Sequence, residues 1–192
     1  MRRILAAVIA VLCMAGPAPA GTKRDPQGDT YRLDVKRVVV RHRSPGAREL
    51  WTLRVETYDA FTNEQLRRNS ENGMYAMAFR FETQGGRPCD RNLQIYVVRR
   101  GEKWEPHARV TGGRGDEYRK WDGGGTFYGY PQVWRADARS ITIRIRESML
   151  SKGGLERFGW GLRTVSGEDT LTANNIYMDY APQGRLAWER EP

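Results

Sequence analysis

The chain has 192 residues, of which 39% are hydrophobic and 10% aromatic, and its formal net charge is +9. That length fits one domain with a single core. The hydrophobic fraction excludes a protein that crosses a membrane many times, the aromatic content argues against disorder, and two cysteines are too few to hold a metal cluster.

The first twenty residues have the pattern of a targeting segment. Arg2 and Arg3 precede an apolar run over residues 4–15, and Ala18-Pro19-Ala20 follows. This predicts a secretory signal peptide over residues 1–20, cleaved after Ala20, and an exported, extracellular domain over residues 21–192. Cys89 would then be the only cysteine. Because a single thiol cannot form an internal disulfide, stability must come from core packing, with or without a bound metal.

Alternating apolar and polar residues predict strands along most of the chain. The candidates are residues 33–42, 50–58, 74–83, 93–100, 104–111, 132–136, 140–147, 158–164 and 184–188. Gly, Pro, Asn and Asp separate these runs, and helix is limited to about one turn each near residues 63–68 and 148–151. We therefore predict an all-β fold, a single antiparallel β-sandwich that is jelly-roll-like and has eight or nine strands.

Two strands carry finer predictions. In the first, the apolar phase changes from Leu33 and Val35 to Val38 and Val40, which predicts a β-bulge near Lys36-Arg37. In the third, one face is expected to hold Tyr75, Met77, Phe79 and Phe81.

A short acidic loop follows the predicted cleavage site. Asp25 and Asp29 flank Gly28, and Ca²⁺ prefers hard oxygen ligands of this kind. The same pattern is also common in surface turns. The first and last strands of a jelly-roll-like sandwich usually lie side by side, so Asp179 could join Asp25 and Asp29 around one ion.

Both ends of the chain resemble a known group. The segments Asp25-Pro26-Gln27-Gly28-Asp29, Leu33-Asp34-Val35 and Asp179-Tyr180-Ala181-Pro182-Gln183-Gly184 resemble secreted bacterial β-sandwich proteins similar to DOMON-like domains and carbohydrate-binding modules of family nine. The resemblance implies a β-sandwich whose opening segment carries calcium ligands, which adds Asp34 to the candidates. Gln27 and Gln183 stand where the group often has an acidic residue.

A glycine-rich stretch over residues 112–131 interleaves with aromatic residues. Exposed aromatic rings can stack on sugar rings. The candidate ligand-binding residues are Tyr118, Trp121, Phe127, Tyr128 and Tyr130. The alternative is that Trp121 and Tyr128 fold back over the open end of the core.

The cationic residues gather in pairs, such as Arg41 with Arg43 and Arg144 with Arg146. The second pair alternates with isoleucines, so it forms either a solvated strand face or an anion-binding face. No nucleic-acid-binding motif accompanies these pairs, which makes an anionic cell-wall polymer or an acidic polysaccharide the expected partner, not a nucleic acid.

No nucleophile or metal-hydrolase motif occurs in the chain. We therefore predict a secreted, non-catalytic and monomeric binding module, stabilised by calcium, for a cell-surface or extracellular glycan or anionic polymer, without stable membrane insertion. Two alternatives remain open. One is a glycosidase-like hydrolase with an unrecognised carboxylate pair. The other is a structural envelope protein.

Overall fold

The structure is a computed structural model that describes residues 19–24, 33–43, 50–67, 75–82, 91–112, 126–150, 157–167, 176–181 and 187–190. Strands dominate these residues. The only helices among them are the short η1 (Glu64–Leu66) and α1 (Glu147–Leu150). Within the described ranges, none of the helices has the length and apolar character needed to cross a membrane.

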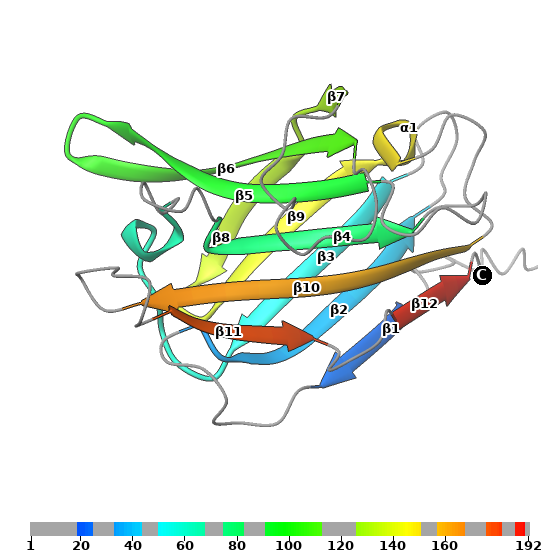
Figure 1. The fold of residues 1–192 in the computed structure, drawn as a ribbon, viewed down its shortest axis with the longest axis horizontal. Helices are drawn as coiled ribbons and strands as arrows, with labels where there is room; N and C mark the ends of the chain where they lie inside the picture. Colours follow the sequence, from blue (N-terminus) through cyan, green and yellow to red (C-terminus); the bar gives the residue numbers. More distant parts are fainter. Residues whose placement is uncertain are drawn as a thin grey trace, which may run out of the picture.

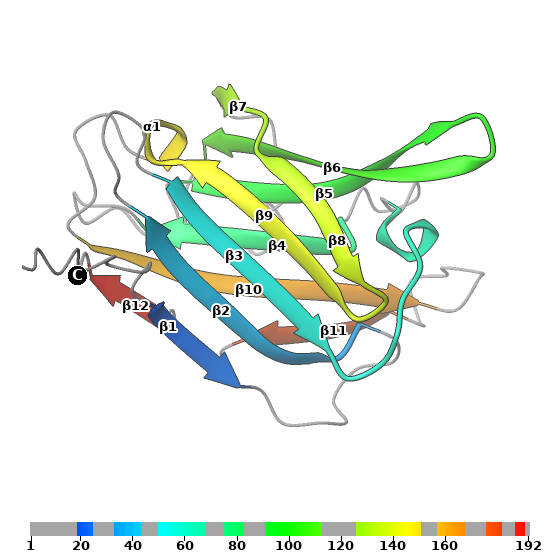
Figure 2. The same ribbon diagram turned by 180° about the vertical axis from the view of Figure 1, so that it is seen from behind.

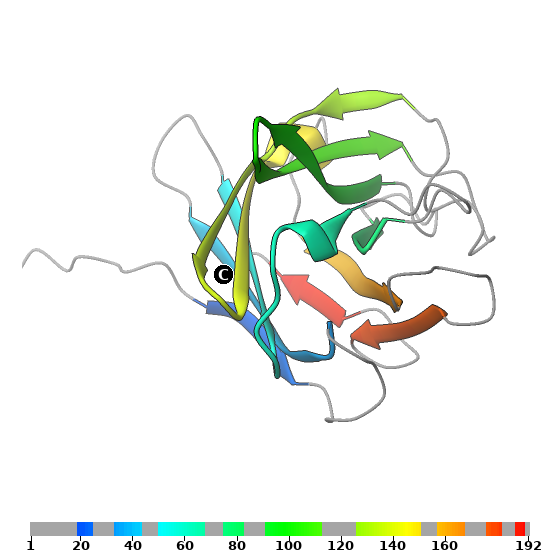
Figure 3. The same cartoon turned by 90° about the vertical axis from the view of Figure 1, so that its left-hand side faces the viewer.

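Two antiparallel sheets face each other (Figures 1 and 3). The small sheet contains, in spatial order, β1 (Pro19–Arg24), β2 (Val35–Arg43), β3 (Leu50–Thr57), β9 (Ser140–Arg146) and β8 (Gln132–Asp137). The large sheet contains β11 (Ile176–Ala181), β10 (Arg157–Gly167), β4 (Met77–Glu82), β5 (Arg91–Arg100), β6 (Lys103–Gly112) and β7 (Phe127–Gly129). A further strand, β12 (Ala187–Arg190), pairs with β10 and lies beside β1.

The predicted antiparallel β-sandwich is confirmed, although its jelly-roll detail is not. The predicted number of strands was too low, because the described residues contain twelve. Each predicted strand has a counterpart, and β1, β7 and β11 are additional. The three residues of β7 include Gly129 at a φ of 148°, so a short glycine-containing segment gave no alternating pattern to recognise.

One continuous core fills the space between the sheets. The small sheet contributes the branched aliphatic residues of β2, β3 and β9, and the large sheet contributes aromatic and aliphatic residues of β4, β5 and β10. The residues with essentially no exposed surface include Val38, Val40, Trp51, Leu53, Val55, Met77, Phe79, Phe81, Leu93, Ile95, Ile141, Ile143, Ile145 and Trp160. Because every second residue of these strands points inward, the residues between them form the two outer faces.

The predicted bulge lies at Lys36. Val35 pairs with Thr57 and Arg37 pairs with Glu56, so Lys36 has no partner of its own on β3. This extra residue lets both Val35 and Val38 point into the core, although they are three positions apart.

Tyr75 corrects the predicted face of the third strand. Met77, Phe79 and Phe81 belong to the core, but Tyr75 packs in a separate cluster with Ala78 and Tyr96. The reason is that β4 begins only at Met77, so the two-residue period does not extend back to Tyr75. Tyr75 therefore belongs to the outer face of the large sheet.

The strand β1 crosses the predicted cleavage position after Ala20. Gly21 to Arg24 pair in continuous register with β2, whereas a register shift separates Pro19 from Gly21. Removal of residues 1–20 would thus leave the regular part of β1 intact.

A polar contact ties α1 to the end of the core. His42 stacks on Trp51 with ring centroids 4.3 Å apart, and its Nε2 lies 3.6 Å from Glu147 Oε2. All three side chains are buried, so the first residue of α1 is fixed between the sheets.

The bulge predicts an asymmetry between two single-residue deletions. Deleting Lys36 should keep Leu33, Val35 and Val38 pointing inward, because it only removes the unpaired residue. Deleting Val39 should turn the preceding strand residues over and expose Val35 and Val38, at about 1.5–3 kcal/mol for each side chain. Urea unfolding of both deletions and of Lys36→Ala would measure this. Equal losses of unfolding free energy for the two deletions would show that the bulge does not set the register.

Candidate functional site

The predicted calcium ligands lie partly within the described structure. Asp25 and Asp29 are outside it. Asp34 is buried just before β2, and its main-chain oxygen accepts a hydrogen bond from the Tyr58 amide at 2.9 Å. On β11, the backbone of Asp179 pairs with Thr164 of β10.

Thr164 links these two positions. Its hydroxyl donates to the Leu33 main-chain oxygen at 2.9 Å, next to Asp34, while Asp179 is its cross-strand partner. The described part of the chain contains no group of three or more His, Cys, Asp or Glu residues that could hold a metal. Carboxylate oxygens suit Ca²⁺, and the full ligand set would need Asp25 and Asp29, so the calcium site stays a prediction.

The predicted aromatic residues divide into three groups. Tyr118 and Trp121 lie outside the described residues. Phe127 and Tyr130 are exposed by 51% and 66%, and their ring centroids are 4.7 Å apart. Tyr128 packs against the core, with the Arg91 guanidinium carbon 3.9 Å from its ring centroid. Its position agrees with the alternative in which this residue covers the open end of the core.

Further aromatic residues line the outer face of the large sheet. Tyr96 of β5 stacks on its cross-strand partner His107 of β6, with centroids 5.8 Å apart. Tyr75 meets Tyr96 edge-on at 6.4 Å. We call Tyr75, Tyr96, His107, Phe127 and Tyr130 the aromatic strip.

The position of Phe127 and Tyr130 follows from the pairing of β6 with β7. Phe127 pairs with Thr111, which is on the same face of β6 as His107. The pKa of Tyr96 is raised, first by burial and then by the neighbouring hydroxyls of Tyr130 and Tyr75. Because the Tyr130 ring contacts the Phe127 ring, the strip runs across β5, β6 and β7.

Arg109 supplies a positive charge beside the aromatic strip. Its Nε donates to Gln94 Oε1 at 2.6 Å, and its Nη2 donates to the Tyr75 hydroxyl. The Tyr75 ring centroid is 5.5 Å from its guanidinium carbon. A cation held in this way is suited to bind a carboxylate, phosphate or sugar hydroxyl next to a stacked ring.

The centre of the same face is polar but buried. One cross-strand row joins Arg163 of β10, Ala78 of β4, Gln94 of β5 and Arg109 of β6. Arg163 is only 2% exposed and Gln94 is fully buried. Among the described residues of this face, Phe127 and Tyr130 are exposed on the side of β6 and β7, so we expect a ligand to reach the face there.

Four residues of this face were not predicted from the sequence: Tyr96, His107, Arg109 and Arg163. Arg163 was detectable in principle, because it stands between Leu162 and Thr164 in an alternating strand. The grouping of Tyr96 with His107 was not, because it depends on the register between β5 and β6.

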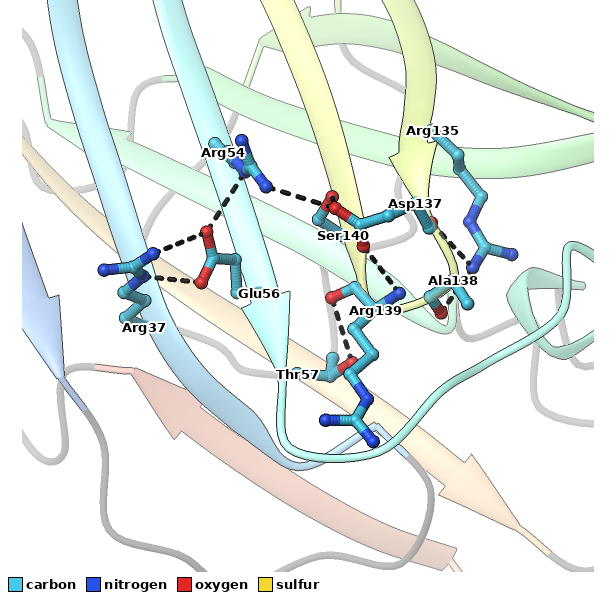
Figure 4. A network of polar contacts seen from close by, with 9 residues as sticks. All are labelled: Arg37, Arg54, Glu56, Thr57, Arg135, Asp137, Ala138, Arg139 and Ser140. Atoms are coloured by element: carbon cyan, nitrogen blue, oxygen red, sulfur yellow. Dashed lines mark hydrogen bonds and ion pairs between the residues drawn. The ribbon is translucent and has the colours of Figure 1, made fainter.

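The outer face of the small sheet carries an ion-pair network at one end (Figure 4). Arg37 binds Glu56 through two hydrogen bonds, Nε to Oε2 at 2.6 Å and Nη2 to Oε1 at 2.9 Å. Arg54 bridges Glu56, at 3.1 Å, and Asp137, at 3.2 Å. Asp137 also accepts from the Ser140 hydroxyl at 2.7 Å.

These contacts keep both carboxylates ionised. The hydrogen bond from Arg37 is the main cause that lowers the pKa of Glu56. The hydrogen bond from Ser140 is the main cause for Asp137, whose pKa is also lowered. A carboxylate with a lowered pKa is a poor general acid, so neither residue has the property that a glycosidase requires of its proton donor.

Compared with known proteins, the chain matches no family model, no curated protein and no solved structure. The resemblance to DOMON-like domains and carbohydrate-binding modules of family nine therefore stays a hypothesis that rests on the two terminal segments.

The network predicts a pH-dependent contribution to stability. Because the pKa of Glu56 is lower in the folded state, its contribution is present at neutral pH and is lost as the pH falls through that lowered value. Glu56→Gln should lower the free energy of unfolding by about 1 kcal/mol at pH 7, or about 2–4 °C in Tm. Thermal melts between acidic and neutral pH would show the difference from wild type disappear at the acidic end. Glu102→Gln, in the exposed turn after β5, is the control and should match wild type throughout; a gap that persists in acid would contradict the assignment.

Calcium binding predicts a stabilisation at the chain ends. At a hundredfold excess over Kd, binding to the folded state contributes about 2.7 kcal/mol. Saturating calcium should thus raise Tm by roughly 5–10 °C. Asp29→Ala should abolish most of the rise, and Asp122→Ala should leave it unchanged. Superimposed melts with calcium and with chelator would rule the site out.

Proposed function

We propose that the protein is a secreted, non-catalytic module that binds an extracellular or cell-surface polysaccharide through the aromatic strip. The observation that carries this proposal is the exposure of Phe127 and Tyr130, whose rings are in contact, on the face of the large sheet that also carries Arg109. Exposed aromatic rings beside fixed polar groups are the surface that sugars require, because a sugar ring has an apolar face and a hydroxyl-bearing rim.

The shape of the site supports a chain-like ligand. The strip crosses three neighbouring strands, from Tyr96 on β5 through His107 on β6 to Phe127 on β7. Phe127 is level with Thr111, four residues along β6 from His107, so these two positions are about 13 Å apart along the strand, and an extended ligand is needed to span them. A polymer that runs diagonally across the strands could contact Tyr96, His107 and Phe127 at once, whereas Tyr75 is buried beneath the surface.

A binding role is favoured over a hydrolytic one by the state of the described carboxylates. Glu56 and Asp137 are neutralised by arginines on the opposite sheet from the strip. Glu105, on β6, forms an ion pair with Arg100 at 3.3 Å. Because the pKa of both Glu56 and Asp137 is lowered, neither carboxylate is suited to protonate a glycosidic oxygen.

The proposal predicts that binding depends on Phe127 and Tyr130. Phe127→Ala and Tyr130→Ala should each weaken retention by about tenfold, because each removes about 1–1.5 kcal/mol of ring stacking. Affinity electrophoresis in gels containing xylan, β-glucan or galactomannan would measure retention. High salt in the gel screens charge effects from the rest of the surface.

Trp134→Ala is the matched control, because Trp134 is a 37% exposed aromatic residue of the small sheet, away from the strip. It should leave retention on neutral polysaccharides unchanged. Equal losses of retention for all three variants would contradict the proposal. So would a wild-type protein that is retained by no neutral or acidic polysaccharide.

A further inference from the structure

Four arginines form a compact block on the outer face of the small sheet. Arg41 and Arg43 lie on β2, and Arg144 and Arg146 lie on β9. All four are exposed, and they alternate with the buried residues of their strands. We call them the arginine quartet. Their two strands flank β3 on either side (Figure 2).

The register fixes the arrangement of the quartet. Arg43, Leu50 and Arg146 form one cross-strand row, and Arg41, Thr52 and Arg144 form the next. The Cα atoms of the two rows are about 6.6 Å apart along the strands, and those of β2 and β9 are about 9.5 Å apart across β3. The quartet therefore surrounds the uncharged side chains of Leu50 and Thr52.

The quartet differs from the other arginines of the same face. Arg37 and Arg54 are neutralised by Glu56 and Asp137. Within the described residues, no carboxylate forms an ion pair with any member of the quartet. Their guanidinium groups thus stay available, and each can bind a carboxylate or phosphate through two hydrogen bonds.

One aromatic ring borders the quartet. The Arg144 guanidinium carbon lies 5.2 Å from the ring centroid of Trp134, on the edge strand β8. Trp134 is partly exposed and pairs with Thr142. A sugar ring can stack on Trp134 while its acidic group reaches Arg144.

The composition of this face favours a thin polymer over a membrane. Among the described residues, Trp134 is the only large apolar side chain exposed on the small sheet, whereas insertion into a membrane interface needs a broad apolar face. A bilayer would also press against the carboxylates of Glu56 and Asp137 at the other end of the face. A linear polymer can lie over the quartet alone.

The presence of only one aromatic ring beside the quartet, among the described residues, also argues against nucleic acid as its ligand. Proteins that bind single strands without sequence preference stack successive bases on several rings along a basic groove. Here Arg41 and Arg43 have no aromatic ring contact among the described residues.

We infer that the arginine quartet binds a linear acidic polysaccharide that lies across β2, β3 and β9. This inference does not rest on the proposed function, because the quartet and the aromatic strip are on opposite sheets. The quartet would bind a polyanion even if the strip bound no sugar.

The test uses residues 21–192, the chain expected after signal-peptide cleavage. Its binding to polygalacturonate, an unbranched carboxylated polysaccharide, is measured by isothermal titration calorimetry at a series of salt concentrations. The double variant Arg144→Glu, Arg146→Glu should weaken binding by about tenfold or more and should reduce the slope of log K against log salt by about half. The milder variant Arg41→Gln, Arg43→Gln should act in the same direction, and it keeps the test decisive if the charge reversal unfolds the protein.

The matched control is Lys103→Glu, Arg139→Glu, which changes the net charge by the same amount at exposed positions outside the quartet. Its binding should stay within about threefold of wild type. Equal weakening by the control and the quartet variants would overturn the inference, because net charge alone would then explain binding.

Two competing partners are measured in parallel. Quartet-dependent binding to phosphatidylglycerol vesicles or to single-stranded DNA that is tighter than binding to polygalacturonate would overturn the assignment to a polysaccharide. Weak binding to both, together with quartet-dependent binding of polygalacturonate and none of uncharged dextran, would support it.

Discussion

The alternation of inward and outward side chains on β2, β3 and β9 is the constraint on which the rest of the structure depends. It places Val38, Leu53 and Ile143 in the core and every arginine of these strands on the outer face. A slip of one residue would bury arginines and expose the aliphatic core, so the register is fixed strongly. The bulge at Lys36 preserves this phase, because it absorbs the one residue that breaks the period.

The same alternation gives the two outer faces different chemistry. Outward positions of the small sheet hold arginines, threonines and two neutralised carboxylates, whereas those of the large sheet hold aromatic rings, amides and the buried Arg163. A face of charges in water binds through long-range attraction that salt weakens. A face of rings binds through contact area and stacking, which salt does not screen. One domain can thus engage a polymer in two physically distinct ways.

A structural feature could be predicted from this sequence where it depends on residues close together in the chain, and could not where it depends on which distant strands pair. Alternation is local, so the strands of the core and the bulge near Lys36 were predictable, as was the aromatic character of Phe127 and Tyr130. The sheet face predicted for Tyr75 was wrong, because β4 begins only at Met77, two residues after Tyr75. The pairing of Tyr96 with His107 and the isolation of the quartet from carboxylates depend on which strands are neighbours, and one sequence does not contain that information locally.

The outer face of the small sheet has paired charges at one end and unpaired positive charges at the other, among the described residues. At one end, Glu56 and Asp137 lie among Arg37 and Arg54, and each repulsion between arginines is compensated by an attraction. At the other end, the four arginines of the quartet face water without such compensation among the described residues. Four like charges gathered on one patch repel one another across the intervening strand, and this repulsion opposes folding. A single acid at Leu50 or Thr52, both flanked by arginines on two sides, would remove this cost. The quartet is therefore better explained by an anion that binds there than by the requirements of the fold.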